Sequence, residues 1–327
     1  MKAIRIHGRG GPDHLVYEDA PQPSPGPGEV LVRAHAAGVI ATELNWDETY
    51  QTKAGSPIPL PIPGRDLSGV VAEVGPGVTT LVKGSQVYAL LDYGRDGAQA
   101  DYTIALPNEL VPKPGTLDHV QAAAVPLSAL TAWQALFDHA HLAAGQTVLI
   151  HGGAGGVGVF AVQLAHWAGA NVITTTSARN RDLLRELGAN ELIDYTTTRF
   201  EEVVHSVDVV LDMVGGDTLE RSWQVIKPGG ILVSVVSPSP PAAAQAAMSK
   251  AKGGEESGGS GGDDVRFVYF IVGPNRDELT QIGELIDAGH LRPIIDTVFP
   301  LAQARQAYEQ AAKGHTRGKI VLSVMDS

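Results

Sequence analysis

The sequence predicts an α/β protein in which a β-rich part accompanies a doubly wound parallel sheet. In residues 1–122, short apolar runs alternate with glycine and proline, which is typical of a compact β-rich domain. From residue 123 onward, strand-like runs alternate with helix-like ones, which indicates right-handed βαβ units. The apolar run 147–150 leads into a glycine cluster followed by a helical pattern, as expected of the first strand, turn and helix of such a sheet.

The composition limits the class of protein. The chain has 327 residues, enough for about two domains, and 43% of them are hydrophobic, as in an ordinary globular protein. The net charge of −12 disfavours sequence-independent nucleic-acid binding and attraction to anionic membranes. The absence of cysteine excludes disulfides, thiolate catalysis and thiolate metal ligands. With no signal peptide and no apolar run of ~18 residues, we expect a soluble, cytoplasmic protein.

The expected elements follow from the apolar patterns. Strands are predicted at 30–32, 69–74, 86–90, 171–176, 191–193, 207–212, 231–236, 266–272, 294–295 and 319–322. Helices are predicted at 122–136, with a break or first turn at Pro126, and at 179–187, 278–288 and 302–312. The glycine- and serine-rich tract 253–262 cannot bury apolar surface, so we expect a surface loop there, either a tolerated insertion or a functional lid.

The glycine cluster carries a nucleotide-binding pattern. Gly153, Gly155 and Gly158 fit G-x-G-x-x-G, in which the glycines permit a tight turn, a close approach of phosphate to the backbone and close packing of helix on strand. The pattern alone is weak, because a structural turn can share it. The strand before it and the helix after it favour a dinucleotide site.

Motifs along the whole chain resemble the medium-chain dehydrogenase/reductase superfamily, and within it the zinc-free quinone oxidoreductase (zeta-crystallin-like) branch. They lie at 8–15, 28–32, 63–71, 74–78, 130–133, 153–158, 187–189, 194–195 and 318–322. The resemblance implies a GroES-like catalytic domain formed by residues 1–122 and 266–327, and a Rossmann domain at 123–265. It also implies hydride transfer from NADPH and a homodimer formed through an edge of the Rossmann sheet.

The zinc ligands of the wider superfamily have no counterpart here. Ile40 stands where the cysteine is expected, and Arg65 replaces the histidine of the usual Gly-His-Glu. Without a metal to polarise an alcohol, reduction of an electrophilic acceptor such as a quinone or an enone remains feasible. We therefore expect no metal.

The end of the second Rossmann strand favours NADPH over NADH. An NAD-specific site has an acidic residue there, whereas this chain has Thr176 and Ser177, followed by Arg179 and Arg181. Hydroxyls and guanidinium groups can receive a 2′-phosphate, although the arginines could simply form a solvated helix start. By resemblance, Tyr195 lies beside that phosphate.

Further cofactor contacts are implied by the resemblance. Gly155, Gly156 and Val157 would offer N–H groups to the pyrophosphate, and Thr131 would lie near the nicotinamide. The residues expected to wall the nicotinamide are Val214, Val236, Phe270, Ile271 and Val272. Lys319 is expected to approach the adenosine. An ordinary surface lysine is the alternative for Lys319.

The acceptor pocket is expected along residues 40–50. Tyr50 is the candidate proton donor or oxygen-orienting group, or else a loop tyrosine that packs on Trp46 or faces solvent. Asn45 occupies a position where the family has a tyrosine. Arg65 could steer an anionic substrate group, or could pair with Asp66 or a nearby glutamate.

The sequence thus predicts an NADPH-dependent reductase of quinones or α,β-unsaturated carbonyl compounds. Two other hypotheses stay open: an NADPH-binding protein of crystallin or sensor type with little turnover, and a zinc alcohol dehydrogenase. No residue pattern specifies the acceptor.

Overall fold

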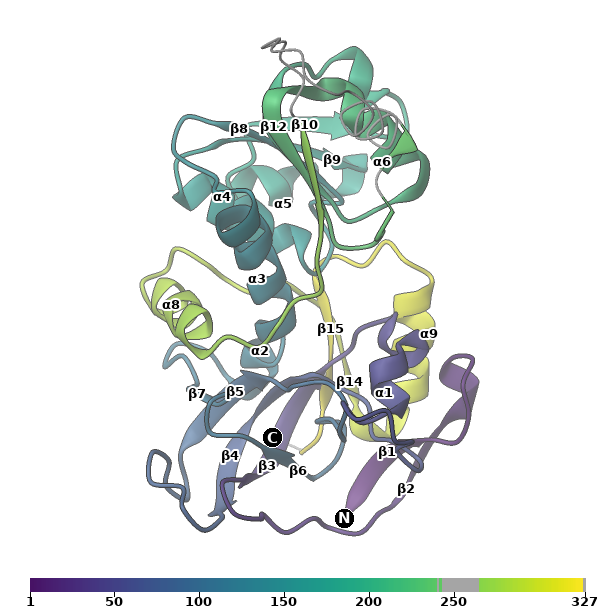
Figure 1. Cartoon of the computed structure of the whole chain (residues 1–327), viewed down its shortest axis with the longest axis vertical. Coiled ribbons are helices and arrows are strands. Elements are labelled where there is room, and N and C mark those ends of the chain that lie inside the picture. Colours follow the sequence, from purple (N-terminus) through teal and green to yellow (C-terminus); the bar gives the residue numbers. More distant parts are fainter. Residues whose placement is uncertain (240, 243–264, 326–327) are drawn as a thin grey trace, which may run out of the picture. The chain divides into compact units, whose positions relative to one another are not determined.

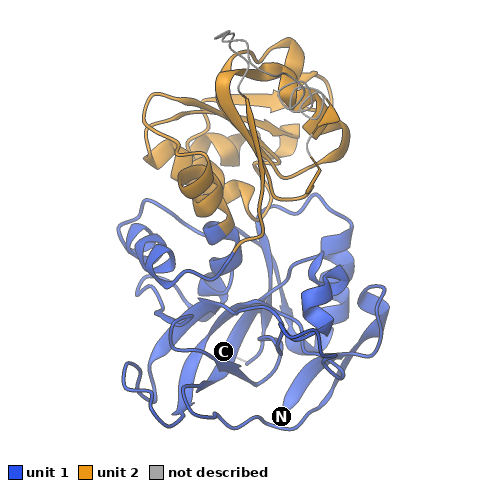
Figure 2. Ribbon diagram, viewed as in Figure 1, with its two compact units in different colours: residues 1–130, 273–327 blue, residues 131–272 orange. Residues whose placement is uncertain are grey.

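The computed structural model describes residues 1–239, 241–242 and 265–325. The chain forms two compact units (Figure 2). Unit 1 comprises Met1–Leu130 and Gly273–Ser327, and unit 2 comprises Thr131–Val272. The glycine- and serine-rich tract 253–262 lies outside the described residues.

Unit 2 contains a six-stranded parallel sheet in the order β10-β9-β8-β11-β12-β13. Figure 1 labels β8, β9, β10 and β12 among its strands. Apolar, β-branched runs form these strands because both faces of a parallel sheet are covered. Their bounds are β8 Thr147–His151, β9 Asn171–Thr176, β10 Glu191–Asp194, β11 Val207–Asp212, β12 Ile226–Ser234 and β13 Arg266–Tyr269. Numbered from β8, this order is 3-2-1-4-5-6, the order of the dinucleotide-binding doubly wound fold.

Helices and helical turns accompany the strands of unit 2, and the α-helices between strands contact the sheet. They are a π-helix η3 Gln134–His139, α4 Gly158–Trp167, η4 Ala178–Asn180, α5 Arg181–Glu186, η5 Phe200–Glu202, α6 Gly216–Ser222 and η6 Trp223–Val225. Helix α5 is followed by Gly188 at φ 104°, a left-handed conformation that glycine adopts without strain. The predicted end of that helix is therefore confirmed.

Unit 1 is built on a mainly antiparallel sheet in the order β14-β15-β3-β4-β5-β7, with β6 also paired to β3. The bounds are β3 Val30–Gly38, β4 Asp66–Val74, β5 Gln86–Leu90, β6 Tyr102–Ala105, β7 Val111–Pro112, β14 Ile295–Pro300 and β15 Lys319–Ser323. Strands β1 Lys2–Ile6 and β2 Leu15–Asp19 form a separate antiparallel pair. Because β15 lies between β14 and β3, the two ends of the chain share one sheet.

Short helices complete unit 1. They are η1 Pro12–His14, η2 Glu43–Asn45, α1 Asp47–Tyr50, α2 His119–Ala122, α8 Arg276–Asp287, η7 Leu301–Gln303 and α9 Ala304–Ala312. Helix α3 Pro126–Trp133 begins in unit 1 and contains the boundary with unit 2. Pro126 is its first residue, where a missing N–H costs nothing, so the predicted first turn at this proline is confirmed.

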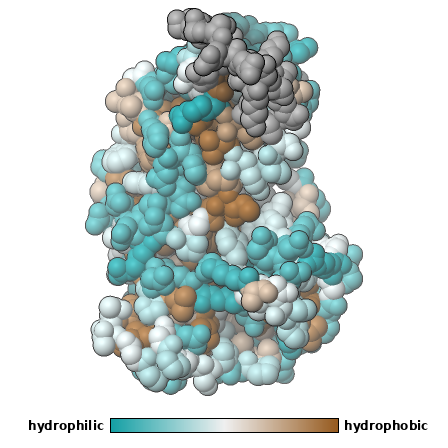
Figure 3. Space-filling view, in the orientation of Figure 1, coloured by the Kyte–Doolittle hydropathy of each residue, from teal (hydrophilic) through white to brown (hydrophobic). Residues whose placement is uncertain are grey.

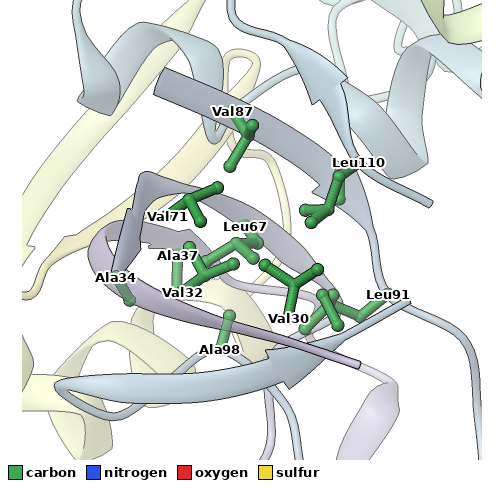
Figure 4. Close-up of a cluster of buried hydrophobic side chains, with 12 residues drawn as sticks. Val30, Val32, Ala34, Ala37, Leu67, Val71, Val87, Leu91, Ala98 and Leu110 are labelled. Atoms are coloured by element: carbon green, nitrogen blue, oxygen red, sulfur yellow. The ribbon is translucent and has the colours of Figure 1, made fainter. Parts of the chain in front are cut away.

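The core of unit 1 lies between its strands. Figure 4 shows small and branched side chains of β3, β4 and β5 pointing toward one another, with others from the loops beside them. The cluster consists of Val30, Val32, Ala34, Ala37, Leu67, Val71, Val87, Ala89, Leu91, Ala98, Ala105 and Leu110. Burial of these side chains fixes the strand register, because a shift by one residue would turn them outward.

The boundaries of the units differ from those predicted. Ala123 and Ala124 pack against Ala36 and Val321 of unit 1, so unit 1 continues past residue 122. Strand β13 pairs with β12 in the parallel sheet, so residues 266–272 belong to unit 2 rather than to the GroES-like part. Both corrections concern the unit against which a short segment packs or pairs. Local sequence patterns do not specify that choice.

The surface is that of an ordinary globular protein. On the face in Figure 3, hydrophilic residues predominate and apolar ones gather in separate patches. Among the described residues, one helical stretch, His119–His139, is long and apolar enough to cross a membrane. Since 78% of its most apolar window is buried within the protein, it is a core helix.

Candidate functional site

The loop between β8 and α4 contains two buried glycines and an accessible segment. Gly153 and Gly158 are buried, and a Cβ on Gly158 would lie 2.3 Å from a backbone carbonyl oxygen of the loop. Gly155, Gly156 and Val157 are half-exposed, and a Cβ on Gly155 would meet nothing closer than 3.4 Å. Because the first N–H groups of a helix have no partner within it, the start of α4 can donate hydrogen bonds to a pyrophosphate.

This loop lies where the strand order reverses. From β8 the chain continues to β9 and β10 on one side of the sheet, whereas β11, β12 and β13 extend the other side. In open parallel sheets, ligands bind beyond the carboxyl ends of the strands at this reversal. The loops after β8 and β11 are therefore the first candidates for cofactor contact.

A row of exposed apolar side chains follows the adjacent strands β11, β12 and β13. Val214 is 55% exposed, Val236 48% and Ile271 62%. The row is continuous with the glycine loop, since a Cβ on Gly152 would lie 3.6 Å from Cγ2 of Val214. A Cβ on Gly215 would similarly lie 3.2 Å from Cγ2 of Val236. Single exposed valines are common, but aligned ones at this edge form an apolar platform suited to a flat ring.

Two of the predicted platform residues face elsewhere. The ring of Phe270 packs against His139, with centroids 4.5 Å apart, and Val272 is buried. Ile271, between them, is the exposed residue. Of the predicted segment 270–272, Ile271 is therefore the residue whose side chain is accessible to a ligand.

The predicted 2′-phosphate residues gather at the ends of β9 and β10. Thr176 is buried at the end of β9, Ser177 is half-exposed and Arg179 is exposed. Tyr195 follows β10 and is 50% exposed. Their placement is compatible with the adenosine end of a dinucleotide, and their contacts with it stay predictions.

A carboxylate that the sequence argument overlooked lies in the same region. Asp194 is aligned with Thr176 in the parallel register of β9 and β10. Hydrogen bonds from the hydroxyl and N–H of Thr196 lower the pKa of Asp194, and the charge of Arg181 contributes. No carboxylate ends β9, as the sequence indicates, but the neighbouring strand β10 places Asp194 opposite Thr176. Recognising it required the pairing of β9 with β10.

The end of β8 is held by a buried histidine. The imidazole of His151 lies 3.1 Å from Oγ1 of Thr175 and 3.0 Å from Oγ of Ser222, and its ring packs edge-on against Phe200. Burial lowers the pKa of His151 to about 3, and the charge of Arg221 contributes. The neutral ring therefore fixes the residue that immediately precedes the glycine loop.

This histidine makes stability depend on pH. The folded-state pKa lies below the ordinary value of 6.5, so its stabilising contribution is complete above about pH 6.5 and is lost as the pH falls toward 3. We expect His151 to account for about 2 kcal/mol of lost unfolding free energy between about pH 8 and about pH 5. Urea denaturation of wild type and His151→Gln at both pH values measures it. Equal losses in the two proteins would contradict the prediction.

In unit 1, residues 40–50 form the segment expected to line an acceptor pocket. Asn45 is exposed. The Tyr50 hydroxyl donates to the carbonyl oxygen of Leu44 at 2.6 Å, and the guanidinium of Arg9 lies 4.3 Å from the ring centroid. Burial raises the pKa of Tyr50, against the charge of Arg9. Trp46 packs edge-on against Tyr93 rather than on Tyr50.

Arg65 does not reach solvent. It is completely buried, and its Nη1 donates to the carbonyl oxygens of Asp92 at 3.1 Å and Arg95 at 2.9 Å. Within the described part of the chain, Arg65 forms no ion pair with Asp66 or Glu43. Both sequence interpretations of Arg65, substrate steering and pairing with one of these carboxylates, therefore need correction. Burial against the loop carbonyls is the physical reason.

Glu43 is a buried acid that holds the segment in place. Its carboxylate accepts the Tyr308 hydroxyl and, at 3.0 Å, the N–H of Gly64. Tyr308 in turn accepts from the amide of Gln99 at 2.8 Å. Burial raises the pKa of Glu43, although both hydrogen bonds oppose the shift. The network joins η2 to α9 and gives this part of unit 1 a fixed shape.

Lys319 is a structural residue of unit 1. Only 5% exposed, it donates to Oδ2 of Asp66 at 2.8 Å and to the carbonyl oxygen of Val39 at 3.4 Å. Oδ1 of Asp66 accepts the N–H of Leu127 at 2.6 Å, near the start of α3. Lys319 is therefore neither the predicted adenosine contact nor a surface lysine, because β15 places it inside the sheet. Thr131, nearly buried on α3, stays a predicted cofactor contact.

The residues at the superfamily's zinc position do not fit a metal. Ile40 and Arg65 offer no ligand, and both oxygens of Asp66 already accept hydrogen bonds. Across the described residues, no three His, Asp or Glu side chains form a cluster that could hold a metal ion. Ile40, Arg65 and Asp66 therefore do not provide the ligand set of a catalytic zinc.

Family profiles match both parts of the chain. The alcohol dehydrogenase GroES-like domain matches residues 26–115, and the zinc-binding dehydrogenase profile matches residues 187–322. The chain belongs to the medium-chain dehydrogenase/reductase superfamily. The α/β fold, with a Rossmann sheet and a GroES-like domain, is confirmed.

Relatives within the superfamily are oxidoreductases. The chain is 32% identical to the mitochondrial NAD(P)H oxidoreductase of Danio rerio, over 92% of this chain and 84% of the relative. It is 34% identical to a 2-haloacrylate reductase of a Burkholderia species, over 98% of both chains. The solved quinone oxidoreductase from Coxiella burnetii is 33% identical, with a TM-score of 0.86 and 99% of each chain covered. This member of the superfamily is thus an oxidoreductase.

Proposed function

We propose that this protein is an NADPH-dependent reductase that transfers hydride to a quinone or an α,β-unsaturated carbonyl compound without zinc. The observation that carries the proposal is the apolar platform beside the glycine loop, formed by Val214, Val236 and Ile271. A phosphate-binding loop next to an apolar surface suits a ligand with a charged middle and a flat, uncharged end. A nicotinamide dinucleotide has this form.

Each part of unit 2 then has a role. The N–H groups of Gly156 and Val157 bind the pyrophosphate, whereas that of Gly155, also predicted to do so, already donates to the carbonyl oxygen of Gly152 at 3.0 Å. The platform keeps water from one face of the nicotinamide. The bound cofactor supplies the hydride. Because the relatives include a quinone oxidoreductase and a 2-haloacrylate reductase, acceptors with an electron-poor carbon–carbon or quinone system are the favoured class.

The proton that follows the hydride comes from solvent or from the segment 40–50. Tyr50 and Asn45 are the candidates in that segment. The hydroxyl of Tyr50 must leave the carbonyl oxygen of Leu44 to donate, and its raised pKa makes it a weak acid. Tyr50→Phe should therefore reduce kcat only if this hydrogen bond breaks during turnover.

The cofactor preference is a separate prediction. We expect NADPH to exceed NADH in kcat/KM by about tenfold or more, because guanidinium groups form charge-assisted hydrogen bonds with a 2′-phosphate. Arg179→Gln should reduce this ratio, and Asp194→Asn, which removes a nearby negative charge, should raise it. Initial rates with both cofactors and one acceptor measure the effect. A ratio near one in wild type would contradict it.

The activity is tested with an acceptor panel. Purified protein and NADPH are mixed with quinones, enones and 2-haloacrylate, and the loss of nicotinamide absorbance is followed. Oxidation that depends on the acceptor supports the proposal. Cofactor binding with no oxidation across the panel would overturn it and would favour a protein of crystallin or sensor type.

Two further expectations remain predictions. A homodimer formed through an edge of the Rossmann sheet would use β10 or β13, the edge strands of the described sheet. The Danio rerio relative is named as mitochondrial, so a cytoplasmic location has no support from it.

A further inference from the structure

A buried carboxylate organises the loop that follows β11. Asp212, the last residue of β11, is completely buried. Its Oδ1 accepts the N–H of Val214 at 3.2 Å and the N–H of Gly215 at 3.0 Å. The side chain therefore fixes the turn that carries Val214, the first valine of the apolar platform.

A buried hydroxyl organises the loop that follows β12. Ser234 is aligned with Asp212 in the parallel register of β11 and β12. Its Oγ donates to Oδ2 of Asp212 at 3.1 Å and accepts the N–H groups of Val236 at 3.4 Å and Ser237 at 3.2 Å. Ser234 therefore fixes the turn that carries Val236, the second valine of the platform.

The hydrogen-bonded pair of Asp212 and Ser234 thus fixes the loops that carry both valines. The two loops also touch, since a Cβ on Gly215 would lie 3.2 Å from Cγ2 of Val236. A hydrogen bond between two buried side chains is lost together with its geometry when either partner is removed. Both valines expose about half of their surface, so the energy of holding them in place comes from the pair beneath rather than from burial of the valines.

We infer that Asp212 and Ser234 are positioning residues that hold Val214 and Val236 as the nicotinamide platform. The inference rests on the proposed function. Neither residue touches the cofactor in this scheme: both are buried, and they act through the loops. The pair should accordingly affect binding of the nicotinamide half and leave the adenosine half unaffected.

Asp208 provides a matched control. It is the second residue of the same strand, and its carboxylate likewise accepts a backbone N–H, that of Thr147 at 2.8 Å. Its oxygens also pair with Lys227. Asp208→Asn therefore weakens a comparable structural contact at the amino end of β11, away from the platform. A general loss of stability would appear in both Asp208→Asn and Asp212→Asn.

The test compares two ligands by calorimetry on the full chain: NADPH, and 2′-phospho-ADP-ribose, which lacks the nicotinamide. In Ser234→Ala and Asp212→Asn we expect the Kd for NADPH to rise about tenfold and the Kd for 2′-phospho-ADP-ribose to change less than about twofold. Asp208→Asn should leave both Kd values within about twofold. Ser234→Ala carries the test if Asp212→Asn does not fold.

The outcomes separate the inference from the proposed function. Equal weakening of both ligands, or no weakening of either, would overturn the positioning role while leaving the reductase proposal intact. Wild-type protein that binds neither ligand would overturn the proposed function, and the positioning role with it. In a variant that turns over, a fall in kcat with NADPH alongside an unchanged KM for the acceptor would add support.

Discussion

Replacement of Gly158 by alanine is expected to lower the free energy of unfolding by about 3 kcal/mol or more. The new methyl carbon would lie 2.3 Å from the carbonyl oxygen of Gly152 and 2.7 Å from the backbone of Gly153. Both neighbours are backbone atoms of the same tight loop, so no side-chain movement relieves the overlap. Chemical denaturation measures the loss, and a change below about 1 kcal/mol would show that the loop adapts.

Gly155→Ala is the matched variant. It should leave the free energy of unfolding nearly unchanged and weaken NADPH binding instead. Its methyl would meet only the Gly152 carbonyl oxygen, at an ordinary 3.4 Å, so stability should change by no more than about 0.5 kcal/mol. The same methyl would occupy the space through which a phosphate approaches the backbone, and NADPH affinity should fall about tenfold or more. Unchanged affinity would show that the pyrophosphate does not cross this glycine.

Removal of the buried cation at Lys319 should have the second large effect. Lys319→Met leaves the Asp66 carboxylate buried and uncompensated, which costs about 3–5 kcal/mol in comparable pairs. Asp66 is completely buried and also accepts the Leu127 N–H, so its charge cannot turn toward water. Denaturation at neutral pH measures the loss.

The double variant Asp66→Asn/Lys319→Met identifies the cause. If the uncompensated charge of Asp66 causes most of the lost stability, the double variant should be more stable than Lys319→Met alone. The asparagine oxygen of the double variant can still accept the Leu127 N–H. Lys2→Met is the surface control: its ion pair with Asp19 is exposed, so it should cost less than about 1 kcal/mol. Equal losses at Lys2 and Lys319 would refute the argument.

Local patterns predicted most of the fold. The strand into Gly153, the helix after Gly158 and the alternation beyond residue 123 depend on neighbours in the chain, and the structure confirms them. Pro126 and Gly188 also act locally. Proline restricts the backbone angles at the start of α3, and glycine permits the left-handed conformation that follows α5.

The errors concern residues whose environment is set by distant parts of the chain. Lys319 meets Asp66 across 253 positions, and Asp194 lies opposite Thr176 only through the pairing of β10 with β9. Within the predicted segment 270–272, only the folded structure distinguishes the exposed Ile271 from Phe270, which packs on His139, and from the buried Val272. Composition and residue spacing do not predict these contacts. They become visible only once the pairing of the strands is known.

The position of β15 has a consequence for synthesis on the ribosome. Unit 2 is an insertion, so residues 131–272 leave the ribosome before the strand that unit 1 needs between β14 and β3. Domains commonly fold as they emerge, and here the inserted domain can finish first. Until the last segment is translated, the end of β3 at residues 36–38 keeps an unpaired edge and Asp66 lacks its cation. The nascent chain is therefore most exposed to misassembly late, after the nucleotide-binding half is complete.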